Sequence, residues 1–208
     1  MQFQHTITTT EQLREVISEP REAARLKQID VIDEHARAFL AKASFALIAT
    51  SNAAGQCDVS PKGDVPGFVQ VLDEHTIVIP DRPGNNRTDS LLNILENPHA
   101  GLLFIIPGVE WTLRVNGRAS IVRDEDILDS LAARDKRPLV AIGVEVEECF
   151  FHCPKAFRRS QLWEPEAWPD HSVLPSMACV LYDKLKPADK TLEEYLRESE
   201  ENIQRTLY

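Results

Sequence analysis

The chain has 208 residues, enough for one large domain or one domain with appendages, and 43% of them are hydrophobic. A formal net charge of −10 argues against a nucleic-acid-binding protein, whose usual footprint is a basic face. A small anionic ligand stays possible, because local cations can outweigh a distant negative balance. No apolar run is long enough to span a bilayer, and the sequence starts without signal-peptide features, so we expect a cytoplasmic protein with no membrane partner.

The four cysteines are expected to be free thiols in a reducing cytoplasm. Cys149, His152 and Cys153 together resemble part of a metal site. A structural zinc needs four ligands, however, and the remaining cysteines and histidines have no helpful spacing. We therefore expect no metal here and interpret the segment as a half-buried loop.

Residues 1–42 are predicted to form a helical arm. Thr9 and Gln12 have the spacing of a capping box at the start of a first helix, which Pro20 ends. A second helix is expected from Arg21 and a third from about Val31 to Ala41, where apolar residues recur with helical spacing.

From residue 43 the apolar pattern becomes that of short strands, which we take as one domain over residues 43–170. Its tight connections and short helices favour an antiparallel barrel over a doubly wound sheet. A bulge or a bend is expected at Asn116-Gly117. The expected strands are Phe45–Thr50, Cys57–Ser60, Phe68–Leu72, Thr76–Pro80, Ala100–Ile106, Trp111–Val122 and Leu139–Val146.

After Phe150 the sequence reads as irregular, and residues 171–208 are interpreted as a connector followed by a final helix. Thr191 and Glu194 have the spacing of a capping box that opens this helix. Because a polar, proline-containing connector precedes it, the helix is the piece expected to detach or to contact a partner.

The first segment with possible chemistry is Ser60-Pro61-Lys62-Gly63-Asp64, interpreted as a turn after a strand. Backbone amides pointing out of such a turn, together with Ser60 and Lys62, can hold an anion or line the polar edge of a planar heterocycle. Taken alone, an ordinary exposed turn is the simpler interpretation.

The second segment runs from Asp81 to Arg87 and lies between a predicted strand and a predicted helix. Anions bind where free backbone N–H groups at a helix N-terminus meet cationic side chains. Arg87 lies just before that helix, Asn85 and Asn86 offer amide donors, and Arg82 offers a second cation. The alternative is a loop rich in turn-forming residues in which Arg82 pairs with Asp81.

The third segment is a polar stripe on a strand. Strand alternation places Thr112, Arg114 and Asn116 on one face, where they could bind a ligand's carbonyl groups and ring nitrogens. Arg118 continues the stripe, which favours the alternative that this is simply the solvent face.

The fourth segment, Pro154 to Trp163, places three cations among two aromatic residues. Phe157 or Trp163 could cover a ligand by stacking on its ring. The alternative is a surface segment whose aromatic side chains pack on the barrel.

In combination and in this order, four stretches resemble the FMN-binding split-barrel flavoproteins related to pyridoxamine 5′-phosphate oxidase. The stretches are DVSPKGDVPGFV, IPDRPGNNRTDSLLNILENP, TLRVNGRASIVRD and FFHCPKAFRRSQLW, and the similarity covers about Phe45 to Trp168. The resemblance implies a six-stranded antiparallel split barrel. It also implies a homodimer with FMN in the clefts between its two subunits.

Residue by residue, the resemblance implies that Asn86, Arg87 and Ser90 approach the FMN phosphate. The segment Ser60, Pro61, Lys62 and Gly63 would lie near the flavin ring or its ribityl chain. Arg82 and Asn85 are counted among the expected cofactor-binding residues for their place in the loop before the helix. Thr112 and Arg114 match a strand that contacts flavin in the family. Lys155 and Arg158 would come from the other subunit.

The sequence departs from pyridoxamine phosphate oxidase itself, because CDVSPKG replaces the expected Arg-x-Val-Leu-Leu-Lys strand. The function implied is therefore an FMN-dependent oxidoreductase acting on a different, unidentified small molecule. One alternative is a protein that binds flavin, haem or deazaflavin without turnover. Another is an inert structural dimer with no chromophore.

Overall fold

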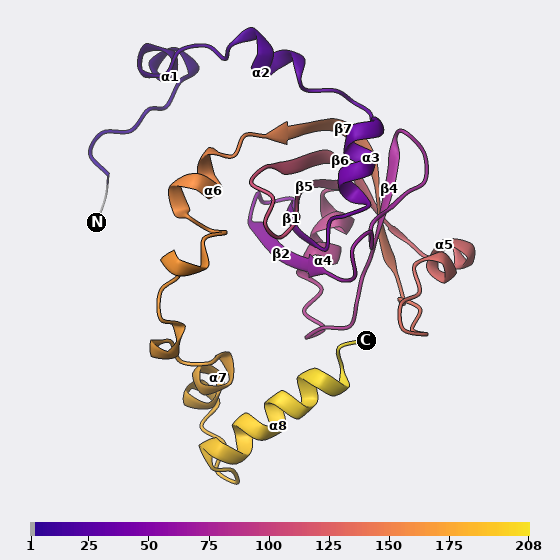
Figure 1. Cartoon of the computed structure of the whole chain (residues 1–208), viewed down its shortest axis with the longest axis vertical. Helices are drawn as coiled ribbons and strands as arrows, with labels where there is room; N and C mark the ends of the chain where they lie inside the picture. The colour runs from indigo at the N-terminus through magenta and orange to yellow at the C-terminus, as the bar shows by residue number, and fades with distance from the viewer. Residues whose placement is uncertain (1–2) are drawn as a thin grey trace.

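The computed structural model describes residues 3–208, in which one antiparallel sheet runs in the order β2-β1-β5-β6-β7-β4-β3 (Figure 1). The mainly β, antiparallel architecture predicted from the sequence is confirmed. The sheet has seven strands rather than six, one of which, β3, is only two residues long. The strands are β1 (Phe45–Ser51), β2 (Cys57–Gly63), β3 (Gln70–Val71), β4 (Thr76–Pro80), β5 (His99–Ile105), β6 (Thr112–Val122) and β7 (Ala141–His152).

The strand predictions differ from the structure mainly at β7. This strand was expected to end at Val146, but it continues to His152, so the segment interpreted as a loop belongs to the sheet as far as His152. The physical reason is the eleven-residue β6, which offers pairing partners along its full length as far as Thr112 opposite His152. The register shift between Asn116 and Gly117 confirms the expected bulge.

The hydrophobic core fills the inside of the curved sheet. Alternation along the strands turns residues such as Ile48 of β1 and Phe104 of β5 inward, and both are fully buried. Helix α3 (Glu34–Leu40) closes this core with Phe39 and Leu40. The Asp33 carboxylate caps α3 by accepting a hydrogen bond from the Ala36 N–H at 2.8 Å.

Two short helices pack on the barrel at places that matter for the candidate site. Helix α4 (Asp89–Glu96) follows β4 and buries Ser90 and Ile94. Helix α5 (Glu125–Ser130), between β6 and β7, buries Leu128 against the outward-facing Val78 of β4.

Two arms leave the barrel (Figure 1). The first carries α1 (Thr10–Val16) and α2 (Glu22–Leu26). The C-terminal arm, residues 154–208, leaves β7, passes down one side of the barrel and returns beneath it. It carries α6 (Lys155–Ser160), two 3-10 turns (Pro165–Ala167 and His171–Val173), α7 (Met177–Leu185) and α8 (Leu192–Arg205).

The helix caps follow the sequence closely but not completely. The capping box of Thr191 and Glu194 is confirmed. Thr9 also caps its helix, whereas the Gln12 side chain accepts from the Thr8 N–H instead of closing a reciprocal box. Helix α7 lies in a stretch interpreted as a connector. Within residues 3–208, none of the helices combines the length and apolar character that crossing a bilayer requires.

The substitution Gly117→Ala tests how closely the backbones of β6 and β7 approach each other at the bulge. A Cβ atom built at this position would lie 1.9 Å from the carbonyl oxygen of Glu145, so the paired strands would have to separate. We expect Gly117→Ala to destabilise the protein by about 3 kcal/mol, or roughly 6–12 °C in Tm for a chain of this size. The shift in Tm is measured by thermal unfolding of the parent protein and the variant, monitored by circular dichroism.

Gly84→Ala is the matched control, because a Cβ atom at Gly84 would meet no atom within 4 Å. This variant should stay within about 0.5 kcal/mol of the parent chain. Equal Tm values for the two variants would contradict the close approach at Gly117.

Candidate functional site

One end of the barrel holds a cavity of about 920 Å³, a size typical of small-molecule sites. The cavity lies between the end of β2, the loop that follows β4, and the first turn of α4. Nine of the thirteen residues singled out from the sequence line it, namely Ser60, Pro61, Lys62, Gly63, Arg82, Asn85, Asn86, Arg87 and Ser90.

The structure corrects the interpretation of Ser60–Gly63 as a turn, because these residues form the last part of β2. Pro61 is tolerated there since β2 is an edge strand, so no ladder hydrogen bond from its missing N–H is lost on the open side. Alternation turns Asp58, Ser60 and Lys62 to the same, less exposed face. The strand therefore presents a row of polar side chains rather than a set of turn amides.

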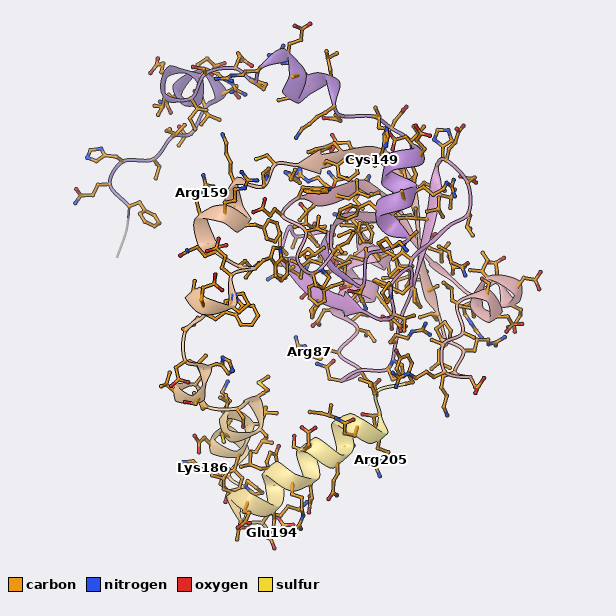
Figure 2. All side chains as sticks on the ribbon, in the orientation of Figure 1. Arg87, Cys149, Arg159, Lys186, Glu194 and Arg205 are labelled. Carbon is orange, nitrogen blue, oxygen red and sulfur yellow. The ribbon has the colours of Figure 1, made fainter. Side chains whose placement is uncertain are left out.

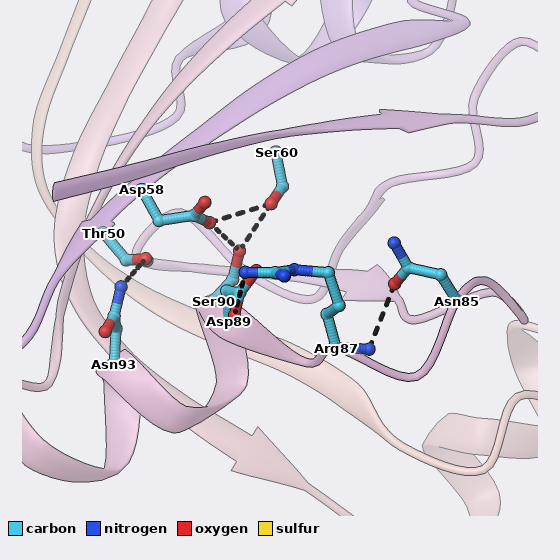
Figure 3. A network of polar contacts seen from close by, with 8 residues as sticks. All are labelled: Thr50, Asp58, Ser60, Asn85, Arg87, Asp89, Ser90 and Asn93. Atoms are coloured by element: carbon cyan, nitrogen blue, oxygen red, sulfur yellow. Dashed lines mark hydrogen bonds and ion pairs between the residues drawn. The ribbon is translucent and has the colours of Figure 1, made fainter. Parts of the chain in front are cut away.

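Asp58 is a site residue that the sequence reasoning missed, and it joins β2 to α4 (Figure 3). Its Oδ2 accepts hydrogen bonds from Ser60 Oγ at 2.9 Å and from Ser90 Oγ at 3.2 Å, and the two hydroxyls lie 3.1 Å apart. Ser90 is 4% exposed. The alternation of the expected strand Cys57–Ser60, which places Asp58 and Ser60 on one face, was the signal that could have revealed Asp58.

The start of α4 has the features of an anion site. Thr88, its N-cap residue, makes no side-chain cap hydrogen bond, so N–H groups of the first turn lack this partner. Thr88 also has a φ of 55°, an unusual value for a β-branched residue, and Asn86 has a φ of 58°. Strained backbone of this kind gathers at ligand-binding loops.

Arg87 projects from the loop before α4, on the side where the C-terminal arm passes (Figure 2). Its guanidinium donates to the Asp89 carboxylate, with Nε 2.8 Å from Oδ2, and its side chain is 71% exposed. The hydrogen bonds and charge of Asp89 raise the Arg87 pKa further. The Arg87 N–H donates to Asn85 Oδ1 at 3.0 Å, which shapes the loop.

Two ion pairs connect β2 to the segment after β4. Lys62 Nζ lies 2.5 Å from Asp81 Oδ1, and Arg82 Nε lies 2.6 Å from Asp64 Oδ2. The expected alternative pairing of Arg82 with Asp81 is thus not the one that the structure shows. Arg82 Nη2 also donates to the Leu131 carbonyl at 2.8 Å, while its Nη1 is buried with no hydrogen-bond partner among the described residues.

The Asp64 carboxylate is fully enclosed and receives several donors. Burial alone would raise its pKa, but hydrogen bonds from Tyr208, the Val65 N–H and Arg82, with the charge of Arg82, outweigh burial and lower the pKa. The Tyr208 hydroxyl donates to Asp64 Oδ1 at 2.6 Å. The same bond, together with burial and the Asp64 charge, raises the Tyr208 pKa.

The remaining four residues singled out from the sequence lie outside this cavity. Thr112 is buried on β6, and Arg114 lies over the Phe150 ring, with its guanidinium carbon 5.1 Å from the ring centroid. Arg158 on α6 binds Glu110 through two nitrogens, and Lys155 is exposed on the same helix. Phe157 stacks on Trp163 with ring centroids 5.7 Å apart.

The Cys149–Cys153 segment does not assemble a metal site. Cys149 and His152 differ in parity along β7, so they face opposite sides of the sheet. Burial, reinforced by the Asp33 charge, raises the pKa of the Cys149 thiol to about 12, which makes it inert. Within residues 3–208, no three histidine, cysteine or acidic side chains lie in an arrangement that could hold a metal ion.

Residues 32–153, more than half of the chain, match the family model described as pyridoxamine 5′-phosphate oxidase. The chain belongs to this family. The match confirms the resemblance that the four sequence stretches carry. A search of curated proteins finds no match.

The solved structures that match this chain do so at low sequence identity. HupZ from Group A Streptococcus is 19% identical, with a TM-score of 0.47, and the alignment covers 58% of this chain and 93% of HupZ. The FAD binding protein from Mycobacterium smegmatis is 16% identical, with a TM-score of 0.41, over 60% of this chain and 97% of that protein.

Asp64→Asn tests the enclosed ion pair. The variant leaves Arg82 without its counter-ion, so we expect a loss of about 3 kcal/mol at neutral pH, measured by urea unfolding. Because the folded-state pKa of Asp64 is lowered, its contribution is present above the unfolded pKa of about 4 and disappears as pH falls through the folded value. The gap between the parent protein and the variant should therefore narrow on acidification.

Asp183→Asn, on the exposed surface of α7, is the control and should change stability by less than about 0.5 kcal/mol. A gap between the parent protein and Asp64→Asn that stays constant from neutral pH to acid would contradict the role assigned to the Asp64 carboxylate.

Proposed function

We propose that the protein is an FMN-dependent oxidoreductase that works as a homodimer on a small molecule. The observation that carries the proposal is the cavity at the end of β2. In a member of this family, it combines an open helix N-terminus, an exposed arginine and a row of hydroxyl and ammonium donors. These are the donor types that a flavin phosphate and the polar edge of a flavin ring need.

The phosphate would bind at Arg87, Asn86 and the first turn of α4, next to Ser90. Lys62, Arg82 and Arg87 each face a carboxylate already, so an incoming phosphate has to compete with one of these pairs. The exposed pair of Arg87 with Asp89 is the weakest competitor, since solvent screens it. Arginine also suits phosphate because its planar fork donates two parallel hydrogen bonds.

The ring and ribityl chain would extend along β2 toward Ser60 and Lys62. Pro61 and Gly63, which alternate with them, bring the strand backbone to the same cavity, and Asn85 lines the loop opposite. The buried Arg82 Nη1 has no partner among the described residues, and a ligand acceptor would satisfy this orphan donor.

The second subunit would supply the residues that this cavity does not contain. Lys155 and Arg158 lie on α6 in the C-terminal arm, and Thr112 and Arg114 lie on β6, all outside the cavity of their own chain. A partner copy that brings its α6 against the cavity would add two cations to the site. Dimer formation is thus part of the proposal.

FMN, when bound, would supply the redox chemistry, and the protein would supply binding, orientation and electrostatics. Lys62 and Ser60 would stabilise negative charge at the polar edge of the flavin ring. The deciding experiment is to purify the protein, record its absorption spectrum, release the chromophore and identify it by mass. Flavin bands and the mass of FMN are expected, followed by NADH or NADPH oxidation in steady-state assays.

Other results of that experiment favour other functions. A Soret band in the absorption spectrum would identify the cofactor as haem rather than FMN. A released chromophore with the mass of a deazaflavin would identify it as a deazaflavin. Bound flavin without turnover of any electron donor would favour a flavin-binding protein over an enzyme. A protein that stays colourless after incubation with excess FMN would contradict the proposal.

Arg87→Ala tests the phosphate site. Removing a charge-assisted, two-pronged contact should weaken FMN binding roughly tenfold to a hundredfold, measured by titrating the apoprotein and following flavin fluorescence. The FMN affinity of Arg87→Lys should lie between those of the parent protein and Arg87→Ala, because lysine keeps the positive charge but cannot donate two parallel hydrogen bonds. Arg118→Ala, on the exposed face of β6, is the control that should leave affinity unchanged.

Asp89→Asn provides a test with the opposite sign. It removes the carboxylate that competes for the Arg87 guanidinium, so FMN binding should tighten or stay the same. Unchanged affinity in Arg87→Ala, or weaker binding in Asp89→Asn, would exclude the phosphate role of Arg87.

A further inference from the structure

The C-terminal end of the chain lines the candidate cofactor cavity. Leu207 and Tyr208 contribute to its wall together with β2 and the Arg87 loop, although 144 residues separate Tyr208 from Asp64. Figure 1 shows the arm returning beneath the barrel to reach this position.

Tyr208 is held there by three groups of the barrel. Its hydroxyl donates to the enclosed carboxylate of Asp64 at 2.6 Å. The guanidinium carbons of Arg134 and Arg82 lie 4.8 and 5.8 Å from the centre of its ring, within the range of cation–π attraction. The tyrosine thus completes the ion pair that closes the barrel, using both its polar and its aromatic parts.

The rest of this segment has almost no hold on the barrel. Within residues 3–208, the only hydrogen bond that joins residues 171–208 to the barrel is the one from Tyr208 to Asp64. None of the described residues of α7 or α8 is buried. Contacts within the arm, such as the edge-on packing of the Tyr182 and Tyr195 rings, hold α7 and α8 together without anchoring them to the barrel.

We propose that residues 171–208 form a strap that reaches the cavity with Leu207 and Tyr208 and that Tyr208 is its latch, so that a ligand enters and leaves only when Tyr208 undocks. A long segment attached at its end by one side chain has two simple states, latched and released. The latched state closes one wall of the cavity. The ligand part of this proposal rests on the proposed function, whereas the latch itself does not.

The first test needs no ligand. Trypsin can cleave after Arg205, just before the latch, when the end of α8 opens, and cleavage rates follow the open population. Tyr208→Phe removes the hydrogen bond to a charged acceptor, so cleavage after Arg205 should become about tenfold faster, measured by mass spectrometry. Tyr208→Ala also removes the ring, so cleavage after Arg205 should be faster still in this variant.

Two controls belong to the same digests. Cleavage after Arg14 in α1, on the other arm, is the internal reference and should not change. Tyr182→Phe removes a hydroxyl that donates to the Lys190 carbonyl within the strap, and it should leave cleavage after Arg205 close to the parent rate. Equal rates after Arg205 in the parent protein and Tyr208→Ala would overturn the latch.

The second test measures exchange of FMN by stopped-flow fluorescence. A latch that only gates passage speeds entry and release equally. Tyr208→Phe should therefore raise both rate constants about tenfold and leave Kd within about twofold. Unchanged rates, or a Kd that weakens in step with a faster release, would overturn the gate, since the latter marks a direct contact with the ligand.

The two tests separate the two proposals. If the parent protein binds no FMN, the proposed function fails, and the trypsin comparison still decides whether Tyr208 holds the strap. If FMN binds but the Tyr208 variants change neither the cleavage rate after Arg205 nor the FMN exchange rates, the strap proposal is wrong and the proposed function stands.

Discussion

The enclosed ion pair of Asp64 with Arg82 joins the two ends of the sheet, and the candidate site depends on it. Strand β2 lies at one end of the strand order and the short β3 lies beyond β4 at the other, so within residues 3–208 no backbone ladder joins the two ends. Side chains take over this task, with Asp64 bound to Arg82 and Lys62 bound to Asp81. Removing one partner of an enclosed ion pair leaves the other charge buried without a counter-ion, which is costly. The two ends of the sheet are therefore held in this one arrangement.

This closure determines which charges remain for a ligand. Lys62 and Arg82 face the cavity but are committed to carboxylates with short contacts and little exposure, so they shape the field of the site more than they supply free cations. Among the described residues, the ion-pair partner of Arg87 is the partly exposed Asp89, two residues further along the chain, and the first turn of α4 lacks a side-chain cap. An anionic group is therefore favoured at the loop end of the cavity.

The sequence predicts most of the fold because local patterns decide it: alternation gives the strands, and Asn116-Gly117 gives the bulge. The sequence reasoning fails where a distant partner decides. β7 extends to His152 because β6 pairs with it, and Ser60–Gly63 is strand because β1 pairs with it. Within the site, nine residues come together as the motifs suggested. Asp58 follows from strand alternation, but nothing local marks Tyr208, whose partners lie more than seventy residues away.

The arms pose the last physical question, because their described helices bury nothing. Helices of this length are marginal in water unless they pack on something. Helix α8 gains from its capping box and its ion pair with Lys190, yet these act inside the arm and cannot fix its position. A fixed position needs a contact with the barrel, and Tyr208 makes it at Asp64. The charge that closes the barrel is thereby also the charge that holds the strap, so the stability of the fold and access to the cavity share one carboxylate.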